Sequence, residues 1–205
     1  MVAPRIRLAT AADGAALAAI YAPAVSVYAT SFELEPPDAA EMARRVEKLT
    51  ARSPWLVCER NGAVVGYAYA GQHRDRWAYQ WSAEVSAYVS EDARRCGVAR
   101  ALYASLFAAL VVQGYRNAYA GITLPNPASV GIHEAVGFTR VGIYRGIGYK
   151  FGAWHDVMWL ERQLAPRVAD PAPPTPLPTA TTDPAFMRAL DAGLGLLHFD
   201  GDRTS

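Results

Sequence analysis

Cysteine is scarce in this sequence. The 205 residues include two, Cys58 and Cys96, which are too few for a disulfide framework and lack the paired spacing of a zinc site. Reduced thiols are typical of the cytoplasm, where disulfides are rare. We therefore expect a cytoplasmic protein with two free thiols and no bound metal.

Long apolar runs and an excess of charge are also missing. No stretch reaches the roughly 18 uninterrupted apolar residues of a membrane span, and residues 1–10 contain no apolar segment of the kind found in secretion signals. Twenty Lys and Arg against nineteen Asp and Glu give a formal net charge of +1, which supplies no field for holding nucleic acid or an anionic membrane. Neither is an expected partner.

What the sequence does contain is a regular succession of strand and helix patterns. Hydrophobic residues make up 52% of the chain and charged residues 19%, which is enough apolar surface for a sizeable core. Expected strands cover 5–8, 55–59, 64–70, 81–90, 118–124, 139–150 and 157–164, and expected helices cover 10–23, 39–51, 101–113 and 127–136. This order predicts an α/β fold, a mixed sheet with helices on both faces.

Local signals mark several element ends. Thr10 and Asp13 have the spacing of a capping box and should start the first helix. Pro23 should end or kink that helix, because proline has no N–H to donate. The pair Asn61-Gly62 is a strong hairpin signal and predicts an antiparallel pairing of the second and third strands.

The composition changes at Ala165. Residues 1–164 form the expected main domain, and residues 165–205 form a proline-rich tail that cannot extend a sheet. Residues 184–197 could make a short amphipathic helix, although Gly193 and Gly195 weaken it. The sequence leaves open whether this tail docks on the main domain or on a partner, or frays.

The segment Arg94-x-x-Gly97-x-Ala99 lies between an expected strand and an expected apolar helix. The free N–H groups of a helix N-terminus bind anions, and nearby arginines suit a pyrophosphate better than a lone carboxylate. The segment is neither a Rossmann fingerprint nor a Walker loop, since G-x-G-x-x-G and G-K-[ST] are absent. It is a candidate anion site whose alternative reading is a solvated helix end.

With this loop, a set of further motifs makes the sequence resemble one family, the GNAT acyl-CoA-dependent N-acetyltransferases, and within it the phosphinothricin N-acetyltransferase branch. The resemblance runs from about Ile6 to Leu164. Its motifs are Arg94 to Ala99, Pro54-Trp55-Leu56-Val57, Gly66 to Gly71, Ala78-Tyr79-Gln80-Trp81, Leu124-Pro125-Asn126, His133-Glu134-Ala135, Gly148-Tyr149-Lys150 and Trp154-His155-Asp156-Val157. It implies the GNAT fold, with a mostly antiparallel sheet of about seven strands, and a reaction that moves acetyl from acetyl-CoA directly to an amine.

The resemblance assigns catalytic roles to two residues. Glu84 matches the family's catalytic carboxylate and lies on the polar face of its strand, with Ser82, Ser86 and Tyr88. It would take a proton from the substrate ammonium. His133 matches a family histidine proposed to work with that carboxylate, either as base or as orienter. Without the resemblance, Glu84 would read as a solvated carboxylate and His133 as a structural histidine.

The resemblance also assigns a coenzyme site. The backbone near Tyr88 and Val89 is expected to face the thioester and pantetheine, and Asn126 to contact the coenzyme while capping its helix. The full expected set is Ala87, Tyr88, Val89, Arg94, Arg95, Cys96, Gly97, Val98, Ala99, Arg100, Asn126 and Ser129. Cys96 fills space in this loop rather than acting as a nucleophile, because no base lies nearby in the sequence.

The expected acceptor pocket consists of Phe32, Tyr69, Arg74, Arg76, Tyr79, Tyr88 and Val157. Arg74 or Arg76 could pair with a carboxylate or phosphinyl oxygen. Glu33 stands where strict phosphinothricin enzymes tend to carry arginine, and it resembles relatives that prefer methionine sulfoximine or methionine sulfone. Trp154-His155-Asp156 is expected to be a turn packed against the pocket or a dimer partner. It is not expected to be part of a catalytic triad, because consecutive side chains on a strand point to opposite faces.

The resemblance therefore predicts a homodimeric enzyme that acetylates the α-amine of a small glutamate- or methionine-like compound. A first alternative is a GNAT enzyme for another amine, such as a polyamine, an aminoglycoside or a protein N-terminus. A second is a non-catalytic acyl-CoA sensor whose C-terminal segment binds a partner. Arg74 and Arg76 disfavour the first, and the presence of both Glu84 and His133 disfavours the second.

Overall fold

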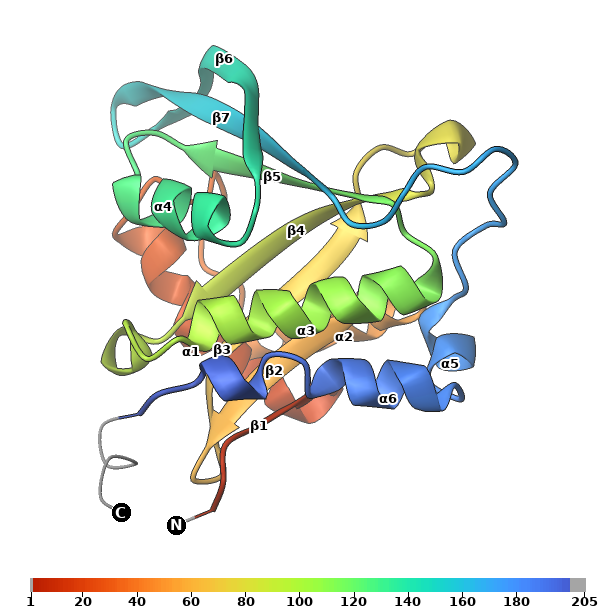
Figure 1. The fold of residues 1–205 in the computed structure, drawn as a ribbon. Helices are drawn as coiled ribbons and strands as arrows, with labels where there is room; N and C mark the ends of the chain where they lie inside the picture. The colour runs from red at the N-terminus through yellow and green to blue at the C-terminus, as the bar shows by residue number, and fades with distance from the viewer. Residues whose placement is uncertain (1, 200–205) are drawn as a thin grey trace.

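A computed structural model describes residues 2–199, which are built around one seven-stranded sheet (Figure 1). The strand order is β1-β2-β3-β4-β5-β7-β6. The strands are β1 (Arg5–Leu8), β2 (Trp55–Arg60), β3 (Ala63–Gln72), β4 (Ser82–Val89), β5 (Asn117–Thr123), β6 (Thr139–Lys150) and β7 (Ala153–Gln163). The α/β class and the seven strands that the sequence and its resemblance predict are confirmed.

Helices cover both faces of this sheet, as predicted. On one face α1 (Gly14–Ser26) and α2 (Ala39–Thr50) bury Leu17, Met42 and Val46 against β2 and β3. On the other face α3 (Val98–Gln113) buries an apolar stripe, and α4 (Pro127–Ala135) adds Val130 to the same core. In the described part of the chain no helix is both long and apolar enough to cross a membrane.

The sheet divides between β4 and β5. These two strands pair in parallel over three residues, Ser82–Glu84 against Asn117–Tyr119. All the other neighbouring strands pair antiparallel and over longer stretches. Beyond Glu84 the two strands have no register with each other, so the edge of each that faces the other is open. The family resemblance implies such a divergence at this point.

The local signals at the start of the chain are largely confirmed. The Thr10 and Asp13 capping box forms, but it opens a 3-10 turn, η1 (Ala11–Asp13), from which α1 continues. Of the two outcomes expected at Pro23, an end of the helix is wrong, because α1 runs through the proline to Ser26. Pro23 costs the helix one N–H donor, while its own carbonyl still accepts from Val27.

The two hairpins have tight turns with positive φ angles. Asn61 and Gly62 have φ of 51° and 81° and join β2 to β3 as predicted. The second such turn is Phe151-Gly152, with φ of 51° and 76°, between β6 and β7. The expectation of a turn at 154–156 is therefore wrong: those residues lie in β7, where His155 pairs with Gly148. The true turn lacks the Asn-Gly signal of the first hairpin, because Phe151 takes the place of the asparagine.

The tail packs along α3 as two short helices and a 3-10 turn, and no single helix spans residues 184–197 (Figure 1). Helices α5 (Leu177–Ala180) and α6 (Pro184–Leu190) are followed by the 3-10 turn η4 (Leu194–Leu196). Gly193 separates α6 from η4, and a Cβ there would overlap the carbonyl oxygen of Ala101 in α3. The glycine that weakens the helical pattern thus permits the closest approach of the two backbones. Further anchors are hydrogen bonds from the Gln113 side chain to Thr175 and from Trp81 to Ala172.

Candidate active site

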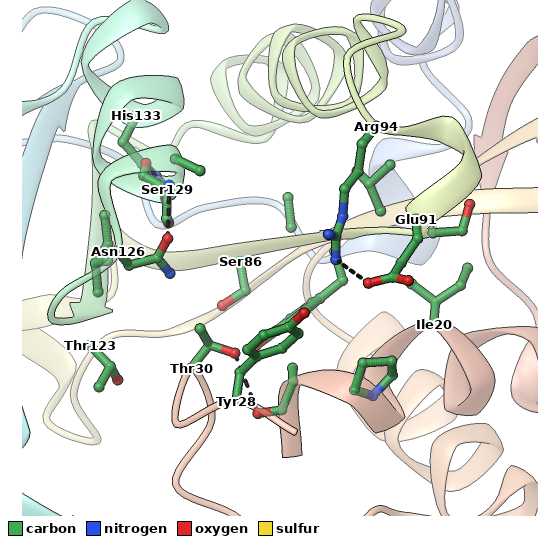
Figure 2. Close-up of a pocket in the computed structure, with 18 of the residues that line it drawn as sticks. Ile20, Tyr28, Thr30, Ser86, Glu91, Arg94, Thr123, Asn126, Ser129 and His133 are labelled. Atoms are coloured by element: carbon green, nitrogen blue, oxygen red, sulfur yellow. Dashed lines mark hydrogen bonds and ion pairs between the residues drawn. The ribbon is translucent and has the colours of Figure 1, made fainter. Parts of the chain in front are cut away.

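A cleft of about 740 Å³ opens where β4 and β5 diverge (Figure 2). Its walls are residues 85–90 of β4 and its end, residues 121–123 of β5, one side of α4 with its cap Asn126, and α1 with the loop after it. Figure 2 shows Asn126, Ser129 and His133 on one side of the cleft, and Arg94 and Glu91 on the other. Both faces of the sheet reach this space, because the strands no longer share hydrogen bonds there. A cleft of this size can hold an extended ligand.

The loop that follows Arg94, the one residue of 94–100 that lines the cleft, has the geometry of an anion-binding nest. Arg95 and Gly97 adopt left-handed φ angles of 62° and 78°, and Gly97 leads directly into α3. The N–H groups of Cys96 and Gly97 donate to no backbone carbonyl in residues 2–199. Successive free N–H groups ahead of a helix N-terminus bind phosphate oxygens well. Arg94 points toward the cleft and pairs with Glu91 at 3.2 Å. These residues fit a diphosphate.

Glu84 lies at the fork of the sheet. It is the last residue of β4 that pairs with β5, opposite Tyr119, and opposite Gly71 on its other side. Its side chain is 40% exposed, so the carboxylate is accessible to a ligand. Glu84 itself is not among the residues that line the cleft, whose wall on β4 begins at the next residue, Val85.

His73 is the neighbour of Glu84 that the sequence did not reveal. Its Nδ1 lies 3.4 Å from Glu84 Oε2, without the alignment of a hydrogen bond. The ring stacks on Tyr119 at a centroid distance of 4.5 Å and meets Trp159 edge-on. Gly71 pairs with Glu84, so His73 follows two residues after the partner of the expected base. That register was the available signal, and it needs the β3–β4 pairing to be known.

His133 lines the cleft and is only 7% exposed. Its Nδ1 lies 2.7 Å from the carbonyl oxygen of Ser129, which can only accept, so Nδ1 carries the proton. Its Nε2 therefore accepts from the hydroxyl of Tyr103 at 2.9 Å. Burial lowers the pKa of His133 and raises that of Tyr103, which keeps the histidine neutral and the tyrosine protonated. Both ring nitrogens are occupied, an arrangement that suits an orienting role better than a base.

Asn126 and Ser129 lie at the start of α4. The Asn126 side chain caps the helix by accepting from the Ser129 N–H at 3.0 Å. This leaves the amide NH₂ of Asn126, which Figure 2 shows on the cleft side, available to a ligand. The predicted double role of Asn126 is compatible with this geometry.

The loop between α1 and α2 carries Phe32 and is held by the β6–β7 hairpin. Lys150 is 4% exposed, and its ammonium donates to the carbonyl oxygens of Val25, Ser31 and Glu33 at 2.6–2.7 Å. Three N–H donors thus meet three acceptors, which satisfies the buried charge. In the sequence Lys150 belongs to the family motif Gly148-Tyr149-Lys150, which indicates no function for it.

Phe32 packs directly on Gly148 of β6. A Cβ on Gly148 would overlap the Phe32 ring, and the ring also lies 6.2 Å from that of His155. The motif Gly148-Tyr149-Lys150 therefore has two structural uses, room for Phe32 and hydrogen bonds to its loop. Thr30 of the same loop lines the cleft, so the hairpin fixes one wall of the site.

Glu33 does not present a free negative charge. Its carboxylate pairs with Arg45 of α2 at 2.8 and 3.0 Å and accepts from the Tyr21 hydroxyl at 2.9 Å. The guanidinium of Arg45 lowers the pKa of Glu33, which keeps the pair ionised. The residue that departs from the phosphinothricin pattern is therefore neutralised within the protein.

The other residues of the expected acceptor pocket fall into separate groups. Arg74 lies 5.9 Å from the Trp159 ring, and Tyr79 meets His73 edge-on, so both belong to the surroundings of Glu84. Arg76 is exposed at the start of the 3-10 turn η2 (Trp77–Tyr79), and Val157 pairs with Thr123 at the cleft wall.

Tyr69 and Tyr88 belong to an aromatic cluster under α1 and α2. Tyr69 stacks on Trp55 at 4.5 Å and lines a second cavity of about 390 Å³. Tyr88 lines the cleft and packs on Tyr21, which lines the second cavity, so this pair of rings lies between the two spaces. Burial raises the pKa of both phenols and keeps them neutral.

The chain matches known proteins over most of its length. Residues 6–159 match the family described as "Acetyltransferase (GNAT) domain". The chain belongs to the GNAT acetyltransferase family. It is thus an acyltransferase, as the resemblance predicts.

Named relatives point to a particular branch of GNAT enzymes. The chain is 42% identical over 176 residues to a phosphinothricin N-acetyltransferase of Streptomyces viridochromogenes, a match that covers 86% of this chain and 94% of the relative. It is 33% identical to an L-methionine sulfoximine/L-methionine sulfone acetyltransferase of Salmonella typhimurium, with 82% and 98% covered. The recognition of this branch is confirmed.

A solved GNAT structure with a ligand is also similar. The phosphinothricin acetyltransferase of Sinorhizobium meliloti, crystallised in complex with acetyl-CoA, superposes with a TM-score of 0.78 at 34% identity. The match covers 83% of this chain and 94% of that one. The chain is therefore somewhat longer than this relative, and the family match itself ends at residue 159, before the tail.

Proposed function

We propose that this enzyme transfers the acetyl group of acetyl-CoA to the α-amine of a small amino-acid-like compound of the phosphinothricin, methionine sulfoximine or methionine sulfone type. The observation that carries this proposal is Glu84, an ionisable side chain at the fork of a cleft whose far end has a nest for a diphosphate. The activities in the names of two relatives support the choice of acceptor.

Different residues of the site bind different parts of the coenzyme. Acetyl-CoA, when bound, supplies the acetyl group as a thioester. The free N–H groups of Cys96 and Gly97 with Arg94 hold the diphosphate, and the open edge of β4 at Ala87–Val89 offers hydrogen bonds to the rest of the coenzyme. Arg95, Val98, Ala99 and Arg100 complete the expected loop, and Asn126 and Ser129 the opposite wall.

Glu84 acts on the acceptor. An α-ammonium is mostly protonated near neutral pH, so its nitrogen cannot attack until a proton leaves. The Glu84 carboxylate accepts this proton directly or through one water. His133 has a positioning role and holds α4 in place through its hydrogen bond to Tyr103. It is not the base, because this bond occupies the lone pair of its Nε2. Transfer is direct, without an acyl-enzyme, and Cys96 takes no covalent part.

The acceptor's acidic end meets one of two exposed arginines, Arg74, which lies in the surroundings of Glu84, or Arg76. Arg74 and Arg76 are both exposed, so either guanidinium is available for bidentate pairing with a carboxylate or phosphinyl group. Because Arg45 neutralises Glu33, an anionic acceptor meets no uncompensated negative charge at that loop. Acetylation removes the basic amine of such a compound, which is a detoxifying reaction when the compound is a toxic amino-acid analogue.

A thiol-release assay tests the acceptor. The enzyme is incubated with acetyl-CoA and equal concentrations of phosphinothricin, methionine sulfoximine, methionine sulfone, ordinary amino acids and spermidine, and free CoA is measured. We expect the highest kcat/KM with one of the first three. Preference for spermidine would show that another amine is the substrate. Tight coenzyme binding with no thiol release from any amine would favour an acyl-CoA sensor.

The proposal includes a homodimer. Strand β6 ends the sheet on one side, and with the turn and start of β7 it exposes a group of large apolar side chains: Val141, Ile143, Tyr144, Ile147, Tyr149, Phe151 and Trp154. Patches of this kind at a sheet edge are typical of an interface, and a second copy of the same edge is the proposed occupant. Sedimentation velocity should give a dimer that Ile147→Glu converts to a monomer. A monomeric wild-type protein at assay concentrations would contradict this.

A further inference from the structure

The tail that lies beyond the family match touches the diphosphate loop. The ring Nε2 of His198 lies 2.9 Å from the carbonyl oxygen of Arg95, and the backbone N–H of His198 donates to the carbonyl oxygen of Cys96 at 3.1 Å. A carbonyl oxygen only accepts, so the hydrogen bond to Arg95 requires the tautomer with the proton on Nε2. Nδ1 of the same ring lies 3.1 Å from the carbonyl oxygen of Leu196, and a neutral imidazole donates to one of these two carbonyls at a time. Leu196 contributes a third contact, because a Cβ on Gly97 would overlap its carbonyl oxygen. We call these contacts the tail–loop contact.

The two hydrogen bonds fix two successive peptide planes. In a planar trans peptide the C=O of one residue and the N–H of the next point in opposite directions. Holding the Arg95 carbonyl toward the tail therefore directs the Cys96 N–H away from it, and holding the Cys96 carbonyl directs the Gly97 N–H away from it. Neither the Cys96 N–H nor the Gly97 N–H has a backbone acceptor in residues 2–199.

The tail lies on the far side of the loop from the cleft. All residues that line the cleft lie between Ala16 and His133, and in Figure 1 helix α3 separates α4 from the α6–η4 segment. The tail therefore contacts the loop from behind and leaves the cleft itself open.

The last described residues of the tail are anchored on the main domain. Phe199 is 4% exposed and lies under the guanidinium of Arg60 at 4.4 Å from the ring centre. Gly193 is close to the α3 backbone, and its N–H donates to Ser105 at 3.1 Å. His198 thus stands between two buried anchors, although its own side chain is exposed.

We propose that His198 is a positioning residue for coenzyme binding: by holding the carbonyls of Arg95 and Cys96 from behind, it presets the Cys96 and Gly97 N–H groups for a diphosphate. Arg95 is a non-glycine residue with a left-handed φ, a conformation that needs support from its surroundings. The tail–loop contact provides that support. The inference rests on the proposed coenzyme site, and its test uses binding rather than turnover.

Calorimetry with CoA tests this role in the full chain. We expect His198→Ala to raise the Kd of CoA about tenfold, the effect of weakening one hydrogen bond to a charged group. His198→Gln, which keeps a side-chain donor, should restore most of the affinity. Met187→Ala, an exposed change on α6 away from the loop, is the matched control and should bind as the wild type does.

Hydrogen exchange of the ligand-free protein gives a second readout. His198→Ala should speed exchange at residues 95–98 and leave the middle of α3 unchanged. An unchanged Kd, tighter binding of CoA, equal weakening in Met187→Ala, or faster exchange along all of α3 would each overturn the proposal. If the wild-type chain fails to bind CoA, the proposed function falls as well, whereas normal binding by His198→Ala overturns this inference alone.

Discussion

Lys150 donates a hydrogen bond to the carbonyl oxygen of Glu33 at 2.7 Å and so connects the β6–β7 hairpin to a loop 117 positions earlier in the chain. Two more bonds from the same ammonium reach Val25 and Ser31. The wall of the site that carries Phe32 is thus fixed by a residue that does not itself line the cleft.

Replacing Lys150 by Met should loosen this loop. Three carbonyl oxygens lose their donor, so we expect a loss of about 2 kcal/mol or more in the free energy of unfolding. The KM for the acceptor should rise several-fold while the Kd of CoA stays the same. Urea unfolding and steady-state kinetics measure the two effects. Lys48→Met, at an exposed position of α2, is the control, and an unchanged acceptor KM in Lys150→Met would contradict the role assigned to this lysine.

Gly148→Ala should displace Phe32, because the new methyl group would occupy the position of the ring. Phe32 is part of the expected acceptor pocket, so the KM for the amine should rise. Gly142→Ala on the same strand has open space around its Cβ and should leave kinetics unchanged. Equal behaviour of the two variants in acceptor titrations would show that Phe32 has no part in binding.

Acid should weaken the contact between Glu33 and Arg45. The pKa of Glu33 is lowered in the folded protein, first by its hydrogen bonds to Arg45. A lowered folded pKa gives stability that is present above the unfolded pKa and lost as the pH falls through the folded value. Glu33→Gln should therefore be less stable than the wild type at pH 7, and the difference should shrink toward pH 3. The measurement is the urea midpoint of each protein across this pH range, with the exposed Glu47→Gln as the control. A difference between Glu33→Gln and the wild type that did not change with pH would contradict the stabilising role of the Glu33–Arg45 pair.

His133 should matter less to the rate than a general base does. Its Nε2 already accepts from Tyr103 and its pKa is lowered by burial, so it has no lone pair free for the substrate proton. We expect His133→Asn to lower kcat about tenfold, compared with the 10²–10⁴ typical of lost acid–base catalysis, and to keep the acid limb of the pH–rate profile. Disappearance of that limb would identify His133 as the base instead.

Much of the fold follows from local patterns in the sequence. Strand alternation around Glu84, the Asn61-Gly62 turn and the Asn126 cap each depend on neighbouring residues, and each is found where it was expected. The errors are also local. Pro23 remains inside α1, and the Phe151-Gly152 turn was missed because a phenylalanine rarely takes a positive φ.

The parts of the site that could not be predicted depend on contacts between distant segments. Lys150 meets Glu33, and His198 meets Arg95, across more than a hundred residues. His73 comes close to Glu84 only through the β3–β4 register. Periodicity shows which face of an element is buried, but it does not show which polar groups of two elements will meet. For these contacts the structure is required.

The most direct test of the whole account is the activity of Glu84→Gln with its best acceptor. The amide keeps the size of the side chain but cannot take a proton, so kcat should fall at least 100-fold. The Kd of CoA, measured by calorimetry, should stay within twofold of the wild type, because the diphosphate nest lies at the other end of the cleft. A variant with wild-type turnover would contradict the central claim that Glu84 is the base.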